Sequence, residues 1–255
     1  WISSEADNSV VGTVFAGKIR VEATQSQKAV SFSEDSWKVI SKAIKTGEYP
    51  YQVGDTKEID MGDLGTHTVR VANTSPCTNG ETSETACGFV VEFADIISKQ
   101  RMNSTDTNVG GWPVSEMRTY VNGTVYNALP KDLQSVITET KVISGHGSTS
   151  GEKNFTSIDK IYLLSSKEVW DEMFYDGVKA ETRQLDYYKN KGVTTLNCSV
   201  AIKQYNSLNS DWWLRSALNN VPITTPFLSI RGSDGSWVGN NASSAYGVSP
   251  AFRIA

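Results

Sequence analysis

"WWLRSA", residues 212–217, and the strand-like runs that follow it decide the fold class of this 255-residue chain. The run is short and mostly apolar, so it predicts a buried strand in which Trp212 and Trp213 pack into the core. Arg215 is the one charged residue inside the run, and we expect it to make a fixed polar contact. Three further strand-like runs follow in the sequence, namely "FLSIR" (227–231), "GSWVG" (235–239) and "GVSPAFRI" (247–254).

The clearest helix lies upstream, in "SFSEDSWKVISKAIKTGEYP" (31–50). Ser33 is a candidate N-cap, and Gly47 ends the pattern as a C-terminal glycine does. The residues expected on one face of this helix are Trp37, Ile40 and Ile44.

Other segments predict both kinds of secondary structure. Residues 57–73 predict a hairpin with its turn near Met61-Gly62-Asp63, and 86–96 predict a buried strand. Residues 111–137 predict two short helices, broken at Asn122-Gly123 and at Pro130. Because helices lie mainly in the first two thirds and strands at both ends, the sequence predicts an α+β fold.

Charge and composition exclude two classes of partner. The chain has 24 Lys and Arg against 28 Asp and Glu, a net charge of −4, and no two adjacent basic residues. This balance disfavours an electrostatic nucleic-acid binder, so we expect no nucleic-acid partner. No apolar stretch approaches the length of a membrane span, so we expect no transmembrane segment in the chain. Low Lys and Arg content with many Ser, Thr, Asn and Gly favours an extracellular protein.

The three cysteines favour a disulfide. Cys77 and Cys87 bracket the short polar loop "CTNGETSETAC", whose ends can easily meet, so a bridge is expected in an oxidising compartment. The alternative is two unrelated buried thiols. Cys198 has no obvious partner. No CxxC occurs, and the two histidines lie far apart in the sequence, so we expect no zinc site.

No common catalytic motif occurs in the sequence. GxSxG, HExxH, a P-loop and GxGxxG are all absent. Two carboxylates that cleave a glycoside can lie far apart in sequence, so this alternative stays open. The expectation is nevertheless a protein that is not an enzyme and needs no cofactor.

Several segments together resemble a family of uncharacterised domains in bacterial surface proteins. They are "NVGGWPVSEMRTYVN" (108–122), "YNALP" (126–130), "YLLS" (162–165), "DWWLRSA" (211–217) and "GVSPAFRI" (247–254). The resemblance covers residues 31–255 and implies a C-type-lectin-like domain, similar to formylglycine-generating enzymes, with short helices around a small mixed β-sheet. Residues 1–30 resemble the last strand of a secreted-fibre or pilus-type β-sandwich, so an extended strand or linker is expected there.

The resemblance also implies a place and a role. It implies a protein of the bacterial cell surface, or a secreted one, that binds a protein or glycan ligand. The calcium-dependent sugar-binding motifs of animal lectins are absent, and so is the C-terminal cysteine that a formylglycine-generating enzyme would need. We therefore expect no metal and no catalytic residue.

Residues 217–255 resemble the variable region of proteins diversified by retroelements, which mutate adenines in a copied template. Codons that end in a pyrimidine after any two bases cannot encode Lys, Glu, Gln, Met or Trp, and Trp237 is the only one of these five types in the stretch. The stretch is rich in Ser, Gly and Asn, as antibody paratopes are. The alternative is that a loop-rich end of a fold favours these residues anyway.

In the stretch and directly before it, the residues expected to form the framework are Trp212, Trp213, Leu214, Arg215, Trp237, Pro250, Phe252 and Ile254. The residues expected to contact a ligand are Asn219, Asn220, Thr224, Thr225, Phe227, Ser229, Arg231, Ser233, Asp234, Ser236, Asn240, Asn241, Ser243 and Tyr246. Phe227, Arg231 and Tyr246 are the expected energetic anchors, because aromatic and Arg side chains dominate binding hot spots.

Two other functions fit the same sequence. One is a structural part of a surface fibre, which residues 1–30 suggest. The other is an enzyme of the formylglycine-generating type or a hydrolase, for which no nucleophile is identified. A display protein with a variable C-terminal surface is the hypothesis that explains the composition of residues 217–255.

Overall fold

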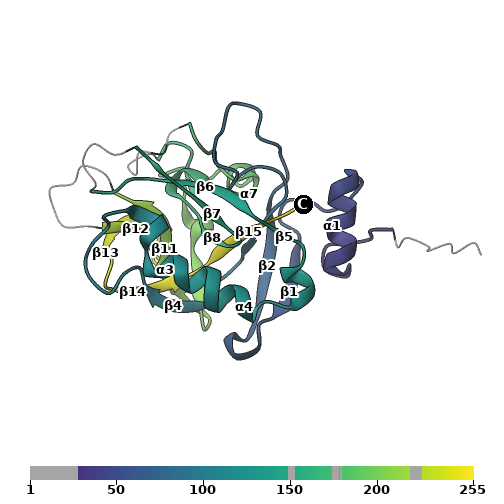
Figure 1. The fold of residues 1–255 in the computed structure, drawn as a ribbon, viewed down its shortest axis with the longest axis horizontal. Helices are drawn as coiled ribbons and strands as arrows, with labels where there is room; N and C mark the ends of the chain where they lie inside the picture. Colours follow the sequence, from purple (N-terminus) through teal and green to yellow (C-terminus); the bar gives the residue numbers. More distant parts are fainter. Residues whose placement is uncertain (1–27, 149–152, 174–177, 179, 219–225) are drawn as a thin grey trace, which may run out of the picture.

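A computed structural model of the chain describes residues 28–148, 153–173, 178, 180–218 and 226–255. These residues form an α+β fold with two main sheets, drawn in Figure 1. The short helix near the start of the described chain lies at one end of the long axis, and the strands of the second sheet lie toward the other. The expected strand or linker in residues 1–30 falls almost wholly outside the described residues.

The first sheet has six antiparallel strands, in the order β1-β2-β3-β15-β5, with β8 also paired to β15. Its strands are β1 (Thr56–Asp60), β2 (Thr66–Asn73), β3 (Val90–Phe93), β5 (Ile137–Thr138), β8 (Tyr162–Leu163) and β15 (Pro250–Ile254). The last strand, β15, pairs with β3, so the end of the chain lies in the same sheet as its early strands.

The second sheet has five strands in the order β13-β12-β11-β14-β4. They are β4 (Ser98–Arg101), β11 (Trp212–Ala217), β12 (Pro226–Ile230), β13 (Trp237–Asn241) and β14 (Ala245–Val248). This sheet is mixed, because β11 and β14 are parallel while the other neighbours are antiparallel. The family resemblance implied one small mixed sheet, whereas the described residues form a mixed sheet and a larger antiparallel one.

Two isolated strand pairs complete the β-structure described. They are β6 (Thr140–Ser144) with β7 (Phe155–Asp159), and β9 (Lys203–Tyr205) with β10 (Leu208–Ser210). The helices are short: α1 (Trp37–Thr46), α2 (Gly111–Val114), α3 (Glu116–Tyr120), α4 (Tyr126–Ala128), α5 (Lys131–Gln134), α6 (Ser166–Val169), α7 (Asp186–Asn190), the 3-10 turns η2 (Gly62–Leu64) and η4 (Ser199–Ala201), and the π-helix η3 (Val121–Val125).

Helix α1 begins three residues later than expected. Its N-cap is Ser36, whose hydroxyl accepts a hydrogen bond from the Val39 amide, so the prediction of Ser33 is wrong. The end of the helix is confirmed, because Gly47 adopts φ 72° there and its amide bonds back to the last turn. Trp37 and Ile40 enter the core, and Ile44 is partly buried against it.

The break expected at Asn122-Gly123 does not occur. Helix α3 continues through the π-helix into α4, so residues 116–128 form one helical run. The Asn122 side chain accepts hydrogen bonds from the amides of Lys160 and Ile161 and donates to the Ile161 carbonyl. Because these contacts hold Asn122 in a wide turn, a dipeptide that is typical of tight turns stays helical. The second expected break is confirmed, since α5 begins only after Pro130.

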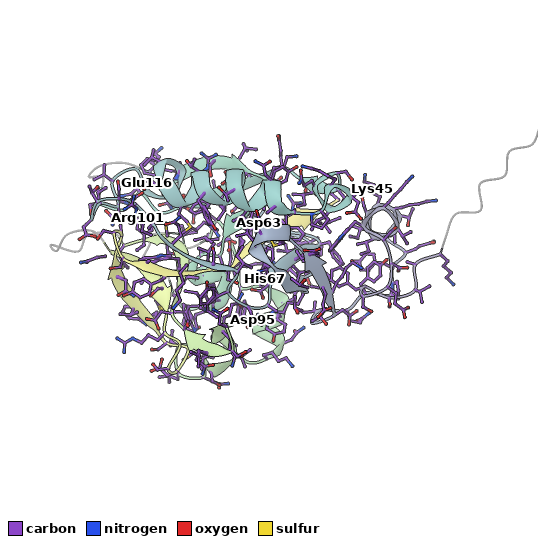
Figure 2. All side chains as sticks on the ribbon, turned by 90° about the horizontal axis from the view of Figure 1, so that it is seen from below. Lys45, Asp63, His67, Asp95, Arg101 and Glu116 are labelled. Atoms are coloured by element: carbon purple, nitrogen blue, oxygen red, sulfur yellow. A yellow bond between two sulfur atoms is a disulfide. The ribbon has the colours of Figure 1, made fainter. Side chains whose placement is uncertain are left out.

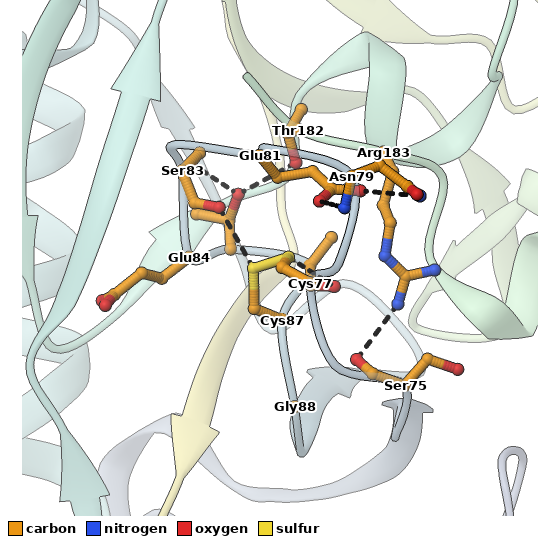
Figure 3. Close-up of a disulfide and its surroundings, with 12 residues drawn as sticks. Ser75, Cys77, Asn79, Glu81, Ser83, Glu84, Cys87, Gly88, Thr182 and Arg183 are labelled. Carbon is orange, nitrogen blue, oxygen red and sulfur yellow. Dashed lines mark hydrogen bonds between the residues drawn. A yellow bond between two sulfur atoms is a disulfide. The ribbon is translucent and has the colours of Figure 1, made fainter. Parts of the chain in front are cut away.

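The disulfide between Cys77 and Cys87 is confirmed (Figure 3). It closes the polar loop beside β3, and Cys198 is free and buried. Thr85, inside this loop, donates a hydrogen bond to the Glu168 carboxylate. The disulfide loop is thereby connected to a buried ion pair of the core.

Candidate ligand-binding surface

The candidate surface lies on the second sheet, whose strand β11 carries a buried ion pair. Arg215 on β11 is fully buried, and its guanidinium forms two hydrogen bonds with the Glu168 carboxylate, one of them 2.7 Å long from Nη1. Glu168 also accepts hydrogen bonds from the Ser165 amide and the Thr182 hydroxyl. The expected fixed contact of Arg215 is therefore confirmed, although its sequence pattern does not identify Glu168 as the partner.

A second buried ion cluster lies between β3 and the strands around it. Lys203 Nζ lies 2.7 Å from the Glu92 carboxylate, and it also donates to the Phe93 carbonyl and the Ser249 hydroxyl. Arg70 pairs with the other Glu92 oxygen at 2.9 Å. Burial acts to raise the pKa of Glu92, but the attraction of Arg70 and Lys203 outweighs burial and lowers it. Glu92 is therefore ionised at neutral pH.

Other expected framework residues are also in the core. Trp212, Trp213, Leu214 and Phe252 are fully buried, and Ile254 nearly so. Pro250 is buried too. Trp237 differs, because 37% of its surface is exposed at the start of β13.

Two of the expected ligand contacts belong to the core instead. Phe227 and Ser229 on β12 are both 0% exposed, so the prediction that they contact a ligand is wrong. The reason is the place of β12 between β11 and β13, with packed layers on both faces. The Ser229 hydroxyl accepts a hydrogen bond of 2.7 Å from the Asn240 amide.

Tyr246 and Asn240 form a half-buried base for the surface. The Tyr246 hydroxyl donates to the Asn240 side-chain carbonyl at 3.1 Å. Its ring meets Trp213 edge-on, with centroids 5.0 Å apart. The Asn240 amide in turn bonds Ser229, so these residues form a chain of satisfied contacts from the core to the surface. This chain fixes the side chain of one expected anchor, Tyr246.

The remaining expected contacts lie in two turns on either side of β13. Arg231, Ser233 and Asp234 are exposed, and Ser236 is half-buried, in the β12–β13 turn. Asn241, the last residue of β13, and Ser243 in the β13–β14 turn are exposed. Asn219, Asn220, Thr224 and Thr225 lie outside the described residues.

Hydrogen bonds support the backbone of both turns. In the first, Asp234 accepts hydrogen bonds from the side chain and the amide of Ser236, and these bonds lower the pKa of Asp234. Gly235 has φ 79°, and a Cβ there would lie only 2.1 Å from the Cys198 carbonyl oxygen, so the turn requires glycine. In the second, the Ser243 amide donates to Asp106 at 2.9 Å. The exposed side chains are thus carried by ordered backbone.

Neither a metal centre nor a membrane helix is found in the part of the chain that the structure describes. There, no three His, Cys, Asp or Glu side chains gather as metal ligands would. Among the same residues, no helix has both the length and the apolar character needed to cross a bilayer.

The fold and the surface together define an α+β domain with buried ion pairs and exposed polar turns. The chain belongs to the family described as a domain of unknown function (DUF6273), whose model matches residues 90–255. The match begins in β3, whereas β1 and β2 precede it and lie in the same sheet. No curated protein and no solved structure matches the chain.

Proposed function

We propose that this protein is an extracellular, non-enzymatic binding module that presents the β12–β13 and β13–β14 turns to a protein or glycan. The residues that make the contacts are then Arg231, Ser233, Asp234, Asn241 and Ser243. The proposal places the protein on the bacterial surface or in a secreted form, with a C-type-lectin-like fold. It needs no cofactor.

One observation supports this proposal above the others. Exposed polar side chains stand beside a half-buried chain of hydrogen bonds that runs from the buried Ser229 through Asn240 to Tyr246. Side chains carried by ordered backbone lose little conformational entropy when they bind, so affinity can come from few contacts. The same arrangement lets exposed side chains change without loss of the core, as retroelement diversification would require.

A library randomised at Arg231, Ser233, Asp234, Asn241 and Ser243 tests the proposal. Most members should fold, as measured by protease resistance on the cell surface, and selection against unrelated proteins and glycans should yield binders. A matched library at Phe227, Ser229 and Trp213 should fold rarely. If the first library also fails to fold, or folds but yields no binder, the display function is wrong.

A further inference from the structure

A pocket with both polar and apolar lining lies between β4 and the helical run that leads from α3 into the π-helix. Its open volume is about 380 Å³, within the range of small-molecule sites. The residues that line it include Gln100, Arg101, Glu116, Tyr120, Gly123 and Thr124. Figure 2 shows Arg101 and Glu116 side by side at one end of the helical run. We call it the Tyr120 pocket.

The walls of the Tyr120 pocket are tied to each other. The Met117 amide donates to the Met102 carbonyl at 3.0 Å, and the Glu116 amide donates to the Asn103 side chain at 3.1 Å. The Tyr120 hydroxyl donates to the Ser98 hydroxyl at 3.0 Å, across the gap between helix and strand. Because these bonds join the helix to β4 and its continuation, the pocket is preformed.

The π-helix contributes Gly123 and Thr124 to the lining of the pocket. Its wide turn is held on the far side by Asn122, which bonds the backbone of Ile161. At Gly123 an added Cβ would meet no atom within 4 Å, so this position faces free space. Isolated π-turns occur frequently at functional sites. The π-helical geometry and the pocket therefore occur at the same residues, Gly123 and Thr124.

The charges in the pocket balance. Arg101 and Glu116 form an ion pair of 3.5 Å, and half of each side chain is exposed. Hydrogen bonds from the Ser104 side chain and amide lower the pKa of Glu116, which keeps this carboxylate ionised at neutral pH. An anionic ligand would meet Glu116, and a cationic one would meet Arg101.

The other lining groups point to the class of ligand. Gln100, Tyr120 and Thr124 each carry groups that donate and accept hydrogen bonds. A ligand with several hydroxyls can satisfy such groups, whereas an apolar ligand would remove them from water without compensation. The Tyr120 ring adds an apolar surface with a polar end. We infer that the Tyr120 pocket binds a neutral saccharide.

This site goes beyond the proposed function, because it shares no residue with the two turns. It lies next to the β13–β14 turn, since Arg101 pairs with Ala245 at the start of β14. The site would serve a display protein, but it does not depend on the turns being variable.

Saturation-transfer NMR on the whole chain tests the inference with glucose, galactose, mannose and N-acetylglucosamine as probes. Methyl phosphate and choline serve as the anionic and cationic probes. We expect at least one sugar to bind, and neither ion. Gly123→Trp should fill the pocket and weaken sugar binding by about tenfold or more. Gly123→Ala is the matched control and should bind as the wild type does, since alanine favours a helix more than glycine.

The outcomes are decisive in either direction. Thr124→Trp, with Thr124→Ala as its control, fills the same pocket from an exposed position if Gly123→Trp does not fold. Absence of binding by all four sugars, binding of an ion alone, or sugar binding that survives both tryptophan variants would overturn the inference. Replacing Asn241 and Ser243 by Ala should leave sugar binding intact, so failure of the display function and failure of this site are distinguishable.

Discussion

Strands β12 and β13 are neighbours in the second sheet and come from the same stretch rich in Ser, Gly and Asn. They nevertheless differ in burial. In β12, Phe227, Leu228, Ser229 and Ile230 are all 0% exposed. In β13, Trp237 and Asn241 are exposed and the three residues between them are half-buried. The difference comes from position, because β12 has a strand on each side while β13 ends the sheet among the described residues. Composition that is typical of a binding surface therefore does not locate one.

The same contrast extends to the rest of the molecule. The framework comprises β11, β12 and the buried ion pairs of Arg215 and Glu92. The display region comprises the two turns on either side of β13. We expect substitutions to affect stability strongly in the framework and weakly in the turns.

The largest effect is expected at Arg215 on β11, and Arg231, in the turn after β12, is its matched control. Arg215→Met should lower the free energy of unfolding by about 3–5 kcal/mol, because Glu168 would remain buried without its partner. Arg231→Met, the matched control, should change it by less than about 0.5 kcal/mol, since Arg231 is exposed. Urea denaturation measures both. Equal effects of the two variants would break the comparison.

Reduction of the disulfide should have the next largest effect. The bridge closes a loop over a sequence separation of 10 residues. On the chain-entropy model it stabilises the fold by up to about 3 kcal/mol. Melting of the Cys77→Ser/Cys87→Ser variant, compared with Cys198→Ser, measures this contribution. Thiol titration of the unfolded, unreduced protein should find one free thiol, and three would contradict the bridge.

The chain of contacts at the boundary between the two regions should give an intermediate effect. Asn240→Ala removes the donor to Ser229 and the acceptor of Tyr246. The loss of satisfied polar groups should lower the free energy of unfolding by about 1–3 kcal/mol. Asn241→Ala, one residue further on and exposed, is the control for chemical denaturation. If Asn240→Ala is as neutral as its neighbour, Asn240 belongs to the display region.

Acid should destabilise the framework before it affects the turns. The pKa of Glu92 is lowered in the folded protein, so its contribution is complete above the usual value of 4.5 and is lost as the pH falls through the lowered pKa. The melting temperature should therefore fall by several degrees as the pH is lowered below 4.5. Calorimetry on Glu92→Gln should show a shallower acid slope, and Asp234→Asn should change the slope less, since Asp234 is exposed. A wild-type slope in Glu92→Gln would assign the acid effect to other carboxylates.

The smallest effect is expected in the turns themselves. Simultaneous replacement of Ser233, Asn241 and Ser243 by Ala should shift the free energy of unfolding by no more than about ±0.5 kcal/mol for each residue. Differential scanning fluorimetry is sufficient to measure this shift. A loss of several kcal/mol would show that the turns belong to the framework.

Several parts of the fold could be predicted from the sequence because their causes are local. Gly47 ends α1 through its own left-handed conformation, and Cys77 and Cys87 meet because the loop between them is short. The apolar run that begins at Trp212 predicts a buried strand, whichever elements of the fold lie beside it. Each of these signals lies within a few residues of the structure it determines.

The sequence by itself therefore determined the α+β class, the hairpin of β1 and β2, the disulfide and the buried "WWLRSA" strand. Only the tertiary structure decided the partner of Arg215, the wide turn at Asn122, and the division of the expected ligand contacts between core and surface. Glu168 lies 47 residues from Arg215 in the chain, and Ile161 lies 39 from Asn122. Burial of a Ser or Phe depends on which strands pack beside it, and that neighbourhood is set by contacts between distant segments rather than by local composition.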